Sequence, residues 1–437
     1  MPGYYRYPAL RGETLIFTCE DDLWTVSASG GVARRLTSGR GESSHPHLSP
    51  DGKWLAFTGR EEGEAEVTLM PAAGGEPRRL TYLGAASRVV GWTPDGKEVL
   101  FSSDARSPFY QPGELFAVRA EDGAVRRLGL GPADDIAFGP GGVRVLGRNR
   151  RDPAFWKRYR GGTAGELWAD LTGKGEFKRL VRTGGNMAWP LWVGGRVFFV
   201  SDHEGTGNLY SVLPSGRGLK RHTSHADFYA RNPSTDGTRI AYQHGASLRL
   251  LDPAAGTDVE VAVDLASPRP QRARRFVSAG RNIEDWELHP QGQSLALVFR
   301  GKLSTMGAWE GPALQHGERD SARYRLPRWM NDGKRVVVVS DAGGEEALEV
   351  HTVSPAGASA PKRLAGLDIG RATSLSVDPK ADRALVANHR NELMCVDLAA
   401  GTMTKVDRSA FGSIRGAAWS PDGRWVAYGF HTSANIS

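Results

Sequence analysis

Apolar and polar residues alternate along this chain in short stretches that are separated by tight turns. The turn Ser49–Gly52 is followed by the apolar run Trp54–Phe57, and a second alternating run covers Val67–Met70. Proline at the second turn position and glycine at the last are typical of turns that join two strands of a hairpin. The pair Gly74-Gly75 and the segment Pro77–Thr81 then end the unit. This pattern predicts a four-stranded meander of about 40 residues.

The same pattern recurs along the whole sequence. One marker residue in each turn gives successive spacings between 39 and 55 residues. The ten markers are Gly12, Asp51, Asp95, Gly141, Gly194, Asp236, Gln291, Asp332, Lys380 and Asp422. Repeats of this length that consist of short strands are typical of β-propellers, in which each repeat forms one blade. The sequence therefore predicts an all-β protein.

Two kinds of side chain recur within the units. Basic pairs such as Arg34-Arg35 and Arg78-Arg79 close several units. We interpret them as solvated charges on outer edge strands, where charge discourages pairing between sheets. Tryptophans lie on or beside the predicted strands, and we expect them to fill the core between blades. They are Trp54, Trp92, Trp168, Trp329, Trp419 and Trp425.

The repeats fall into two groups. Six lie within residues 1–266, for which we predict a six-bladed β-propeller. Residues 267–275 contain two prolines and four arginines, break the repeat and are interpreted as a basic linker. Residues 276–437 contain four more repeats and predict a second, partial propeller, because ten blades exceed the usual four to eight. The tenth repeat stops inside a blade, so we expect these 437 residues to be the front portion of a longer protein.

Composition narrows the possible functions only slightly. The net charge of +7 arises from 56 basic and 49 acidic residues, a mild and dispersed excess that argues only weakly for nucleic acid or an anionic membrane as partner. Cys19 and Cys395 lie far apart, so no disulfide framework or thiolate metal site is implied. No apolar run is long enough for a signal peptide or a membrane span. We therefore expect a soluble cytoplasmic protein without a nucleic-acid or membrane partner.

Three segments are more specific than the repeated turn. They are EDDLWTVSASGGVARRLTSGRGESSHPHLSPDGKWLAFTGR near the start, WKRYRGGTAGELW (Trp156–Trp168) and RHTSHADFYARNPSTDGTRIAY (Arg221–Tyr242). They resemble the amino-terminal part of the tricorn protease family. The resemblance covers essentially the whole chain, and the order of a six-bladed propeller followed by a second one also agrees with that family.

The resemblance implies that the propellers and the catalytic domains have different functions. In that family a seven-bladed propeller follows the first ring, so this chain would hold four of about seven blades of the second. A PDZ domain and the serine and histidine of the active site lie in the carboxy-terminal half, which is outside this sequence. The resemblance thus implies no catalytic residue, no metal and no cofactor in this chain. It implies propellers that select peptides or unfolded polypeptide for a hexameric, cytoplasmic, ATP-independent peptidase that degrades oligopeptides.

Arginines are the candidate binding residues. Relatives can carry adjacent arginines before the third-blade turn that hold the free carboxylate of a peptide. The corresponding stretch here, TYLGAASRVVGWTPDG, offers only Arg88, so either Arg88 alone serves or the anchor is missing. Residues 147–163 interleave aromatic residues with further candidates, Arg148, Arg150 and Arg151. This insertion is interpreted as packed structure with solvated arginines, as a peptide-docking segment, or as a site for single-stranded nucleic acid.

Motifs of other chemistry are missing. The sequence contains no GxSxG elbow and no HExxH or CxxC pattern, and His222 and His225 would point to opposite faces of a strand. Asp202-His203-Glu204 follows an apolar strand and is interpreted as a solvated hairpin turn rather than an acid/base or metal cluster. The alternative to a peptidase region is a non-enzymatic scaffold of the TolB-like or WD type that binds protein partners. Fold alone does not separate these two functions.

Overall fold

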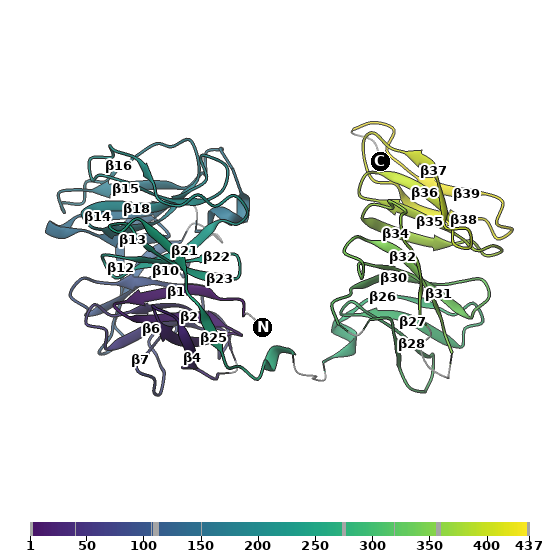
Figure 1. The fold of residues 1–437 in the computed structure, drawn as a ribbon, viewed down its shortest axis with the longest axis horizontal. Helices are drawn as coiled ribbons and strands as arrows, with labels where there is room; N and C mark the ends of the chain where they lie inside the picture. Colours follow the sequence, from purple (N-terminus) through teal and green to yellow (C-terminus); the bar gives the residue numbers. More distant parts are fainter. Residues whose placement is uncertain are drawn as a thin grey trace. The chain divides into compact units, whose positions relative to one another are not determined.

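The computed structural model consists of two compact units, Met1–Ala273 and Arg274–Ser437 (Figure 1). It describes residues 3–39, 41–105, 107, 113–149, 151–272, 277–318, 320–354 and 360–434. Strands dominate both units, and the helical segments are four short 3-10 turns. They are η1 (Pro140–Gly142), η2 (Pro153–Trp156), η3 (Pro270–Arg272) and η4 (Ala279–Arg281). Among the described residues, no helix has the length and apolar character needed to cross a bilayer.

The first half of the first unit forms three blades. Each blade is an antiparallel sheet in which consecutive strands lie side by side, from the innermost strand to the outer edge. The strands are β1 (Arg6–Arg11), β2 (Thr14–Cys19), β3 (Asp22–Ser27) and β4 (Gly31–Arg35) in blade one, β5 (Ser43–Leu48), β6 (Trp54–Gly59), β7 (Glu66–Pro71) and β8 (Arg78–Arg79) in blade two, and β9 (Ser87–Trp92), β10 (Glu98–Ser103), β11 (Glu114–Arg119) and β12 (Val125–Pro132) in blade three.

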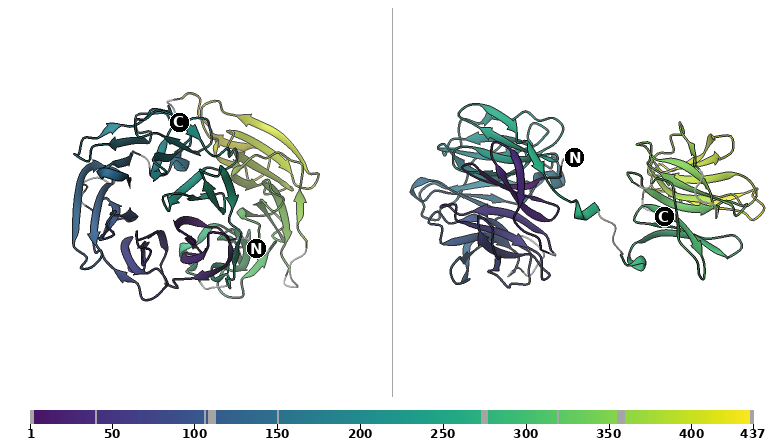
Figure 2. Two further views of the ribbon diagram at one scale, coloured as in Figure 1. Left: turned by 60° about the vertical axis from the view of Figure 1, so that its left-hand side comes forward. Right: turned by 60° about the horizontal axis from the view of Figure 1, so that its bottom comes forward.

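Three further blades complete the ring, which Figure 2 shows as sheets around a common centre. The strands are β13 (Asp135–Phe138), β14 (Arg144–Arg148), β15 (Glu166–Asp170) and β16 (Lys178–Arg179) in blade four, β17 (Met187–Val193), β18 (Arg196–Ser201), β19 (Asn208–Val212) and β20 (Lys220–Arg221) in blade five, and β21 (Ala230–Thr235), β22 (Ile240–His244), β23 (Ser247–Asp252) and β24 (Thr257–Glu260) in blade six. Apolar side chains of neighbouring sheets pack together, as Val67 of blade two and Phe101 of blade three do.

The ring closes through a short strand at the end of the first unit. Strand β25 (Val263–Leu265) pairs in parallel with the outer strand β4 and becomes the fifth strand of blade one. The segment after β25 still contacts blade one, because Arg269 forms an ion pair of 3.2 Å with Glu20. Part of the segment interpreted as a linker therefore lies against the first propeller. Closure thus adds a strand from the end of the unit to blade one, whose strands β1–β4 remain consecutive in the sequence.

The second unit contains three four-stranded blades and one two-stranded sheet within the described residues. The strands are β26 (Ile283–Leu288), β27 (Ser294–Phe299), β28 (Lys302–Gly307) and β29 (Leu314–His316), then β30 (Tyr324–Trp329), β31 (Arg335–Ser340), β32 (Ala347–Thr352) and β33 (Lys362–Leu364), then β34 (Ala372–Val377), β35 (Arg383–Asn388), β36 (Glu392–Asp397) and β37 (Thr402–Arg408), and finally β38 (Arg415–Trp419) and β39 (Val426–Gly429). The predicted fold, a six-bladed propeller followed by a partial second one, is confirmed.

The basic pairs at the outer edges are only partly solvated. The first arginine of the pair in blade two, Arg78, is exposed, but Arg79 forms an ion pair of 3.2 Å with Glu66, which is 2% exposed. The hydroxyl of Thr81 donates a hydrogen bond of 2.5 Å to the same carboxylate and accepts one of 2.9 Å from the amide of Val67. The sequence Arg-Arg-Leu-Thr therefore fastens the outer strand to the strand before it.

The same clasp recurs around the molecule. The second basic residue of the pair, or its equivalent, contacts a carboxylate of the third strand in most blades, and this carboxylate is the first residue of the strand in all the pairs except that of Glu349. The pairs are Arg35 with Asp22, Arg127 with Glu114, Arg179 with Glu166, Arg363 with Glu349 and Lys405 with Glu392. Arg35, Arg127 and Arg179 are exposed, as the interpretation of these pairs as solvated charges expects, but each also bonds to a carboxylate of its own blade and so stabilises the outer strand.

Candidate functional site

The innermost strands of the first unit surround a channel. Its cavity of about 380 Å³ is lined by residues from all six blades and runs along these strands from Tyr7 to Arg11 on blade one. Trp189 and Trp192 of β17 give the wall an aromatic part, and Asn232 gives it a polar part. The channel therefore offers both apolar and hydrogen-bonding contacts along its length.

A repeated bulge shapes the wall of this channel. The pairing of the innermost strand with the second strand shifts register at the same place in blades one, two, five and six. The residue at each shift has a positive φ and precedes a proline, as Tyr7 (51°), His45 (48°), Trp189 (55°) and Asn232 (49°) do. Bulges re-aim side chains and leave backbone groups unpaired. The bulges therefore re-aim the side chains of these four residues at the same level of the channel.

Two histidines of blade two line this channel. The ring of His45 stacks on Tyr7 with 3.9 Å between centroids. Burial, together with the nearby cation of Arg88, lowers the pKa of His47 to about 4 and holds the pKa of His45 well below its ordinary value. Both imidazoles are therefore neutral at neutral pH, when they can donate and accept hydrogen bonds.

The lowered pKa values of these histidines predict that the stability of the first propeller depends on pH. The pKa values of His222 and His225 are also lowered to about 4, mainly by burial. Between pH 4 and pH 6.5 the unfolded chain binds protons at these histidines that the folded chain does not bind, so stability must fall as the pH falls through this window. We expect the urea midpoint of the first propeller to decrease from pH 7 to pH 5, and His47→Gln to make this decrease shallower. Constant midpoints over this range would contradict the assignment of neutral histidines.

Arg88, predicted as a carboxylate anchor, lies in the channel wall but is already engaged. It is 8% exposed, and its Nη2 donates to Asp135 Oδ1 at 2.9 Å and to the carbonyl of Asp134 at 2.6 Å. Burial raises the pKa of Asp135, and Arg88 opposes this shift. The structure also brings Arg151 to this place, because its Nε lies 3.7 Å from Asp134 Oδ1. A role of Arg88 and Arg151 in binding a peptide carboxylate stays a prediction.

The other two predicted residues are not brought to the channel by any described contact. Arg148 at the end of β14 donates to the carbonyl of Leu130 at 2.9 Å and lies 5.2 Å from the ring of Trp168. It therefore packs between blades three and four, where burial lowers its pKa. Arg150 lies outside the described residues.

The insertion between β14 and β15 reaches from blade four to blades five and six, and we call its residues 151–165 the strap. Asp152 begins the turn η2 by accepting a hydrogen bond of 2.9 Å from the amide of Ala154, and Pro153 follows at the favoured first position. The other carboxylate oxygen of Asp152 accepts a hydrogen bond of 2.9 Å from Arg231 of β21. Since the strap leaves blade four and reaches the innermost strand of blade six, it spans the start of the innermost strands.

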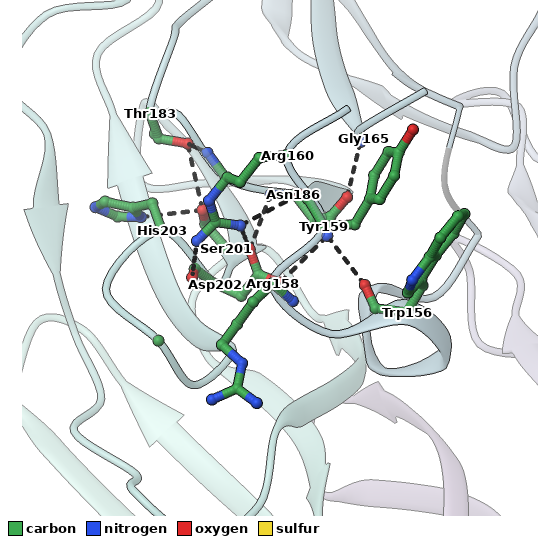
Figure 3. A network of polar contacts seen from close by, with 12 residues as sticks. Trp156, Arg158, Tyr159, Arg160, Gly165, Thr183, Asn186, Ser201, Asp202 and His203 are labelled. Atoms are coloured by element: carbon green, nitrogen blue, oxygen red, sulfur yellow. Dashed lines mark hydrogen bonds and ion pairs between the residues drawn. The ribbon is translucent and has the colours of Figure 1, made fainter. Parts of the chain in front are cut away.

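A buried carboxylate in blade five holds the other half of the strap (Figure 3). Asp202 is 0% exposed and accepts hydrogen bonds from the amide of Arg158 at 2.8 Å and from the guanidinium of Arg160 at 3.0 Å. The amide of Asn186 donates to it at 2.9 Å and the hydroxyl of Tyr229 at 3.3 Å. The interpretation of Asp202 as part of a solvated turn is wrong, because this side chain is the buried anchor of the strap.

The tip of the strap carries exposed aromatic residues. Phe155 is 86% exposed and Trp156 is 56% exposed. One face of the Trp156 ring stacks on Tyr159, with 4.3 Å between the ring centroids. The expectation of packed aromatic residues is wrong for Phe155 and Trp156, whereas the expected exposure of the arginines is confirmed for Arg158 and for Arg160, which also bonds to Asp202. The channel and the strap together can hold an extended chain and contact it near one end.

Comparisons with known proteins agree with this architecture. The family model of the tricorn protease N-terminal β-propeller domain matches residues 2–257, and that of the tricorn protease second β-propeller domain matches residues 283–437. Tricorn protease homolog 1 of Streptomyces coelicolor is 38% identical over 98% of this chain and 40% of its own length. The tricorn protease homolog of Saccharolobus solfataricus is 33% identical over 98% of this chain and 39% of its own length.

A solved structure gives the same result. The crystal structure of the tricorn protease superimposes with a TM-score of 0.79 at 30% identity, over 98% of this chain and 42% of that chain. The chain thus spans about two-fifths of the length of these relatives. Both family models and the superposition cover the two propellers described above, and the chain therefore belongs to the tricorn protease family.

Proposed function

We propose that this chain is the propeller region of a tricorn-type serine peptidase and that the channel of its first propeller selects peptides for an active site elsewhere in the protein. The whole protein would degrade oligopeptides in the cytoplasm without ATP, as a homo-oligomer with its own PDZ and protease domains. The channel, with its aromatic and polar walls, is the observation that carries the proposal.

Extended peptides suit the chemistry of this channel. The six innermost strands are sheet edges, and sheet edges present unpaired N–H and C=O groups that can bind the main chain of a peptide without regard to its sequence. Trp189 and Trp192 of the channel wall add apolar contacts. The exposed Phe155 of the strap offers another. A peptide-selecting channel needs this combination, since main-chain binding gives affinity and a few side-chain contacts give preference.

A bulky residue at the channel mouth tests the proposal. Pro94 lies in an exposed turn that lines the channel, so Pro94→Trp narrows the mouth without removing a core contact. We expect the dissociation constant of fluorescein-labelled unstructured decapeptides, measured by anisotropy, to rise about tenfold, which corresponds to about 1.4 kcal/mol. Pro77→Trp is the matched control, because Pro77 is equally exposed but lies outside the channel lining. Equal affinities of the two variants and the parent would overturn the proposal.

A further inference from the structure

Two histidines and an aspartate meet on the surface of the first propeller. His225 and Asp227 lie in the connection between β20 and β21, and His244 ends β22. One ring nitrogen of each histidine and one carboxylate oxygen of Asp227 lie within 4.8 Å of one another. Among the described residues, no other group of three or more histidine, cysteine, aspartate or glutamate side chains meets this distance condition.

The three side chains are already arranged around one place. Nε2 of His244 lies 3.1 Å from Oδ1 of Asp227. The rings of His225 and His244 stack with 3.8 Å between centroids and 26° between planes, so one ring must turn for both to bind the same ion. Two imidazoles and one carboxylate are a ligand set that suits Zn²⁺, with a fourth position left for water. Bonds of about 2.0–2.1 Å place neighbouring ligand atoms of a tetrahedral zinc site about 3.4 Å apart. The pair formed by His244 and Asp227 is close to this spacing.

Residues behind His225 fix its tautomer. The hydroxyl of Tyr242 lies 2.8 Å and 2.7 Å from the two carboxylate oxygens of Asp258, so it donates its single proton to Asp258. Its oxygen must then accept a proton from Nε2 of His225, which lies 2.8 Å away. A neutral imidazole with its proton on Nε2 carries a lone pair on Nδ1. Outer residues orient metal-binding histidines in this way, because they hold the proton on the nitrogen that does not bind.

Carboxylates lie beside both rings. Asp258 of β24 lies 3.7 Å from His225 and bonds to Arg249 of β23, and Asp227 lies 3.1 Å from His244. We propose that His225, Asp227 and His244 bind a Zn²⁺ ion, with Tyr242 and Asp258 as the outer residues that orient His225.

The ion would join the connection between β20 and β21 to the end of β22. Asp227 is 63% exposed, so its carboxylate can move the short distance that a metal bond requires. Tyr229 follows two residues later in the same connection, and its hydroxyl reaches Asp202, the anchor of the strap. Zinc therefore stabilises the connection that supports the strap, and binding to the folded state alone must raise the melting temperature.

Titration of the full chain with zinc tests the proposal. Tag-free protein is treated with EDTA, dialysed and titrated with ZnCl₂ by calorimetry. We expect one Zn²⁺ per chain and a higher melting temperature with zinc. Asp227→Asn and His244→Gln should each weaken binding at least about 100-fold, more than the 10–100-fold that is typical for loss of an outer residue. His389→Gln is the control, because this exposed histidine lies in the second unit outside the cluster.

A second variant separates a metal site from a merely stacked pair. Tyr242→Phe removes the hydrogen bond that fixes the tautomer but leaves all three ligands, and we expect about tenfold weaker binding. Visible absorption of the Co²⁺-loaded protein should report four-coordinate geometry in the parent and in His389→Gln, but not in Asp227→Asn. Since Asp227 is exposed, Asp227→Asn should fold normally. Lack of zinc binding by the parent, or equal binding by Asp227→Asn, would overturn the proposal.

Discussion

Replacement of Asp202 by alanine is expected to lower the free energy of unfolding of the first propeller by about 3–5 kcal/mol, because several donors lose one shared acceptor and each buried unpaired group costs about 1–3 kcal/mol. The carboxylate is fully buried and accepts hydrogen bonds from the strap, from Asn186 and from Tyr229. Alanine leaves these donors without their acceptor, and Arg160 without its counter-charge. The strap should therefore detach while the blades remain folded.

Two measurements separate the loss of stability from the detachment of the strap. Urea denaturation reports the loss of stability, and limited proteolysis followed by mass spectrometry reports cleavage within residues 151–165. Asp264→Ala is the matched control, since the side chain of Asp264 on β25 is exposed and its loss should change stability by less than about 0.5 kcal/mol. If Asp202→Ala keeps the parent's stability and resistance to protease, Asp202 does not anchor the strap.

Removal of the buried carboxylate in the blade-two clasp should have the second largest effect. Glu66 accepts hydrogen bonds from Thr81, from Arg79 and from the amide of Gly84 at 2.8 Å. Glu66→Ala leaves the buried hydroxyl of Thr81 without its acceptor and also removes the partner of Arg79 and of the Gly84 amide, so we expect a loss of about 2–4 kcal/mol in the free energy of unfolding. The outer strand β8 has only two residues and depends on this contact.

The chain offers a close control for this prediction. Glu62 binds the same guanidinium of Arg79 at 2.7 Å but is 71% exposed, so Glu62→Ala should change the free energy of unfolding by less than about 1 kcal/mol. A double-mutant cycle with Thr81→Val should show coupling between Thr81 and Glu66, because the two share one hydrogen bond. Similar losses for Glu62→Ala and Glu66→Ala would show that burial of Glu66 contributes little.

The sequence predicted the blades because turns and strand alternation are local properties. Each hairpin turn is set by four neighbouring residues, and their spacing gives the number of blades. Side-chain environments were predicted less well. Trp92 and Trp329 are buried between blades as expected, but Trp54 is 44% exposed and Trp425 is 72% exposed. Both exposed rings follow a turn directly, where the second strand begins at the edge of the blade.

The site was harder to predict because its contacts join distant residues. Asp152 and Arg231 are 79 residues apart and belong to non-adjacent blades, so no local pattern could pair them. His225 and His244 meet only because the second strand of blade six returns beside the connection before it. The sequence does contain one local signal of the channel. A proline follows the bulged residue in four innermost strands, and the recurring Tyr7-Pro8, His45-Pro46, Trp189-Pro190 and Asn232-Pro233 pairs mark the channel level.

The closure by β25 has a consequence for how such chains can change during evolution. In the first propeller the four consecutive antiparallel strands of every blade come from one uninterrupted stretch of sequence, because β25 is added beside β1–β4 of blade one. Duplication or deletion of about 40 residues would therefore add or remove a whole blade without dividing any sheet between two parts of the gene. Rings of different blade number can thus arise from one repeat, provided that a three-residue strand at the end still reaches the edge of the first blade.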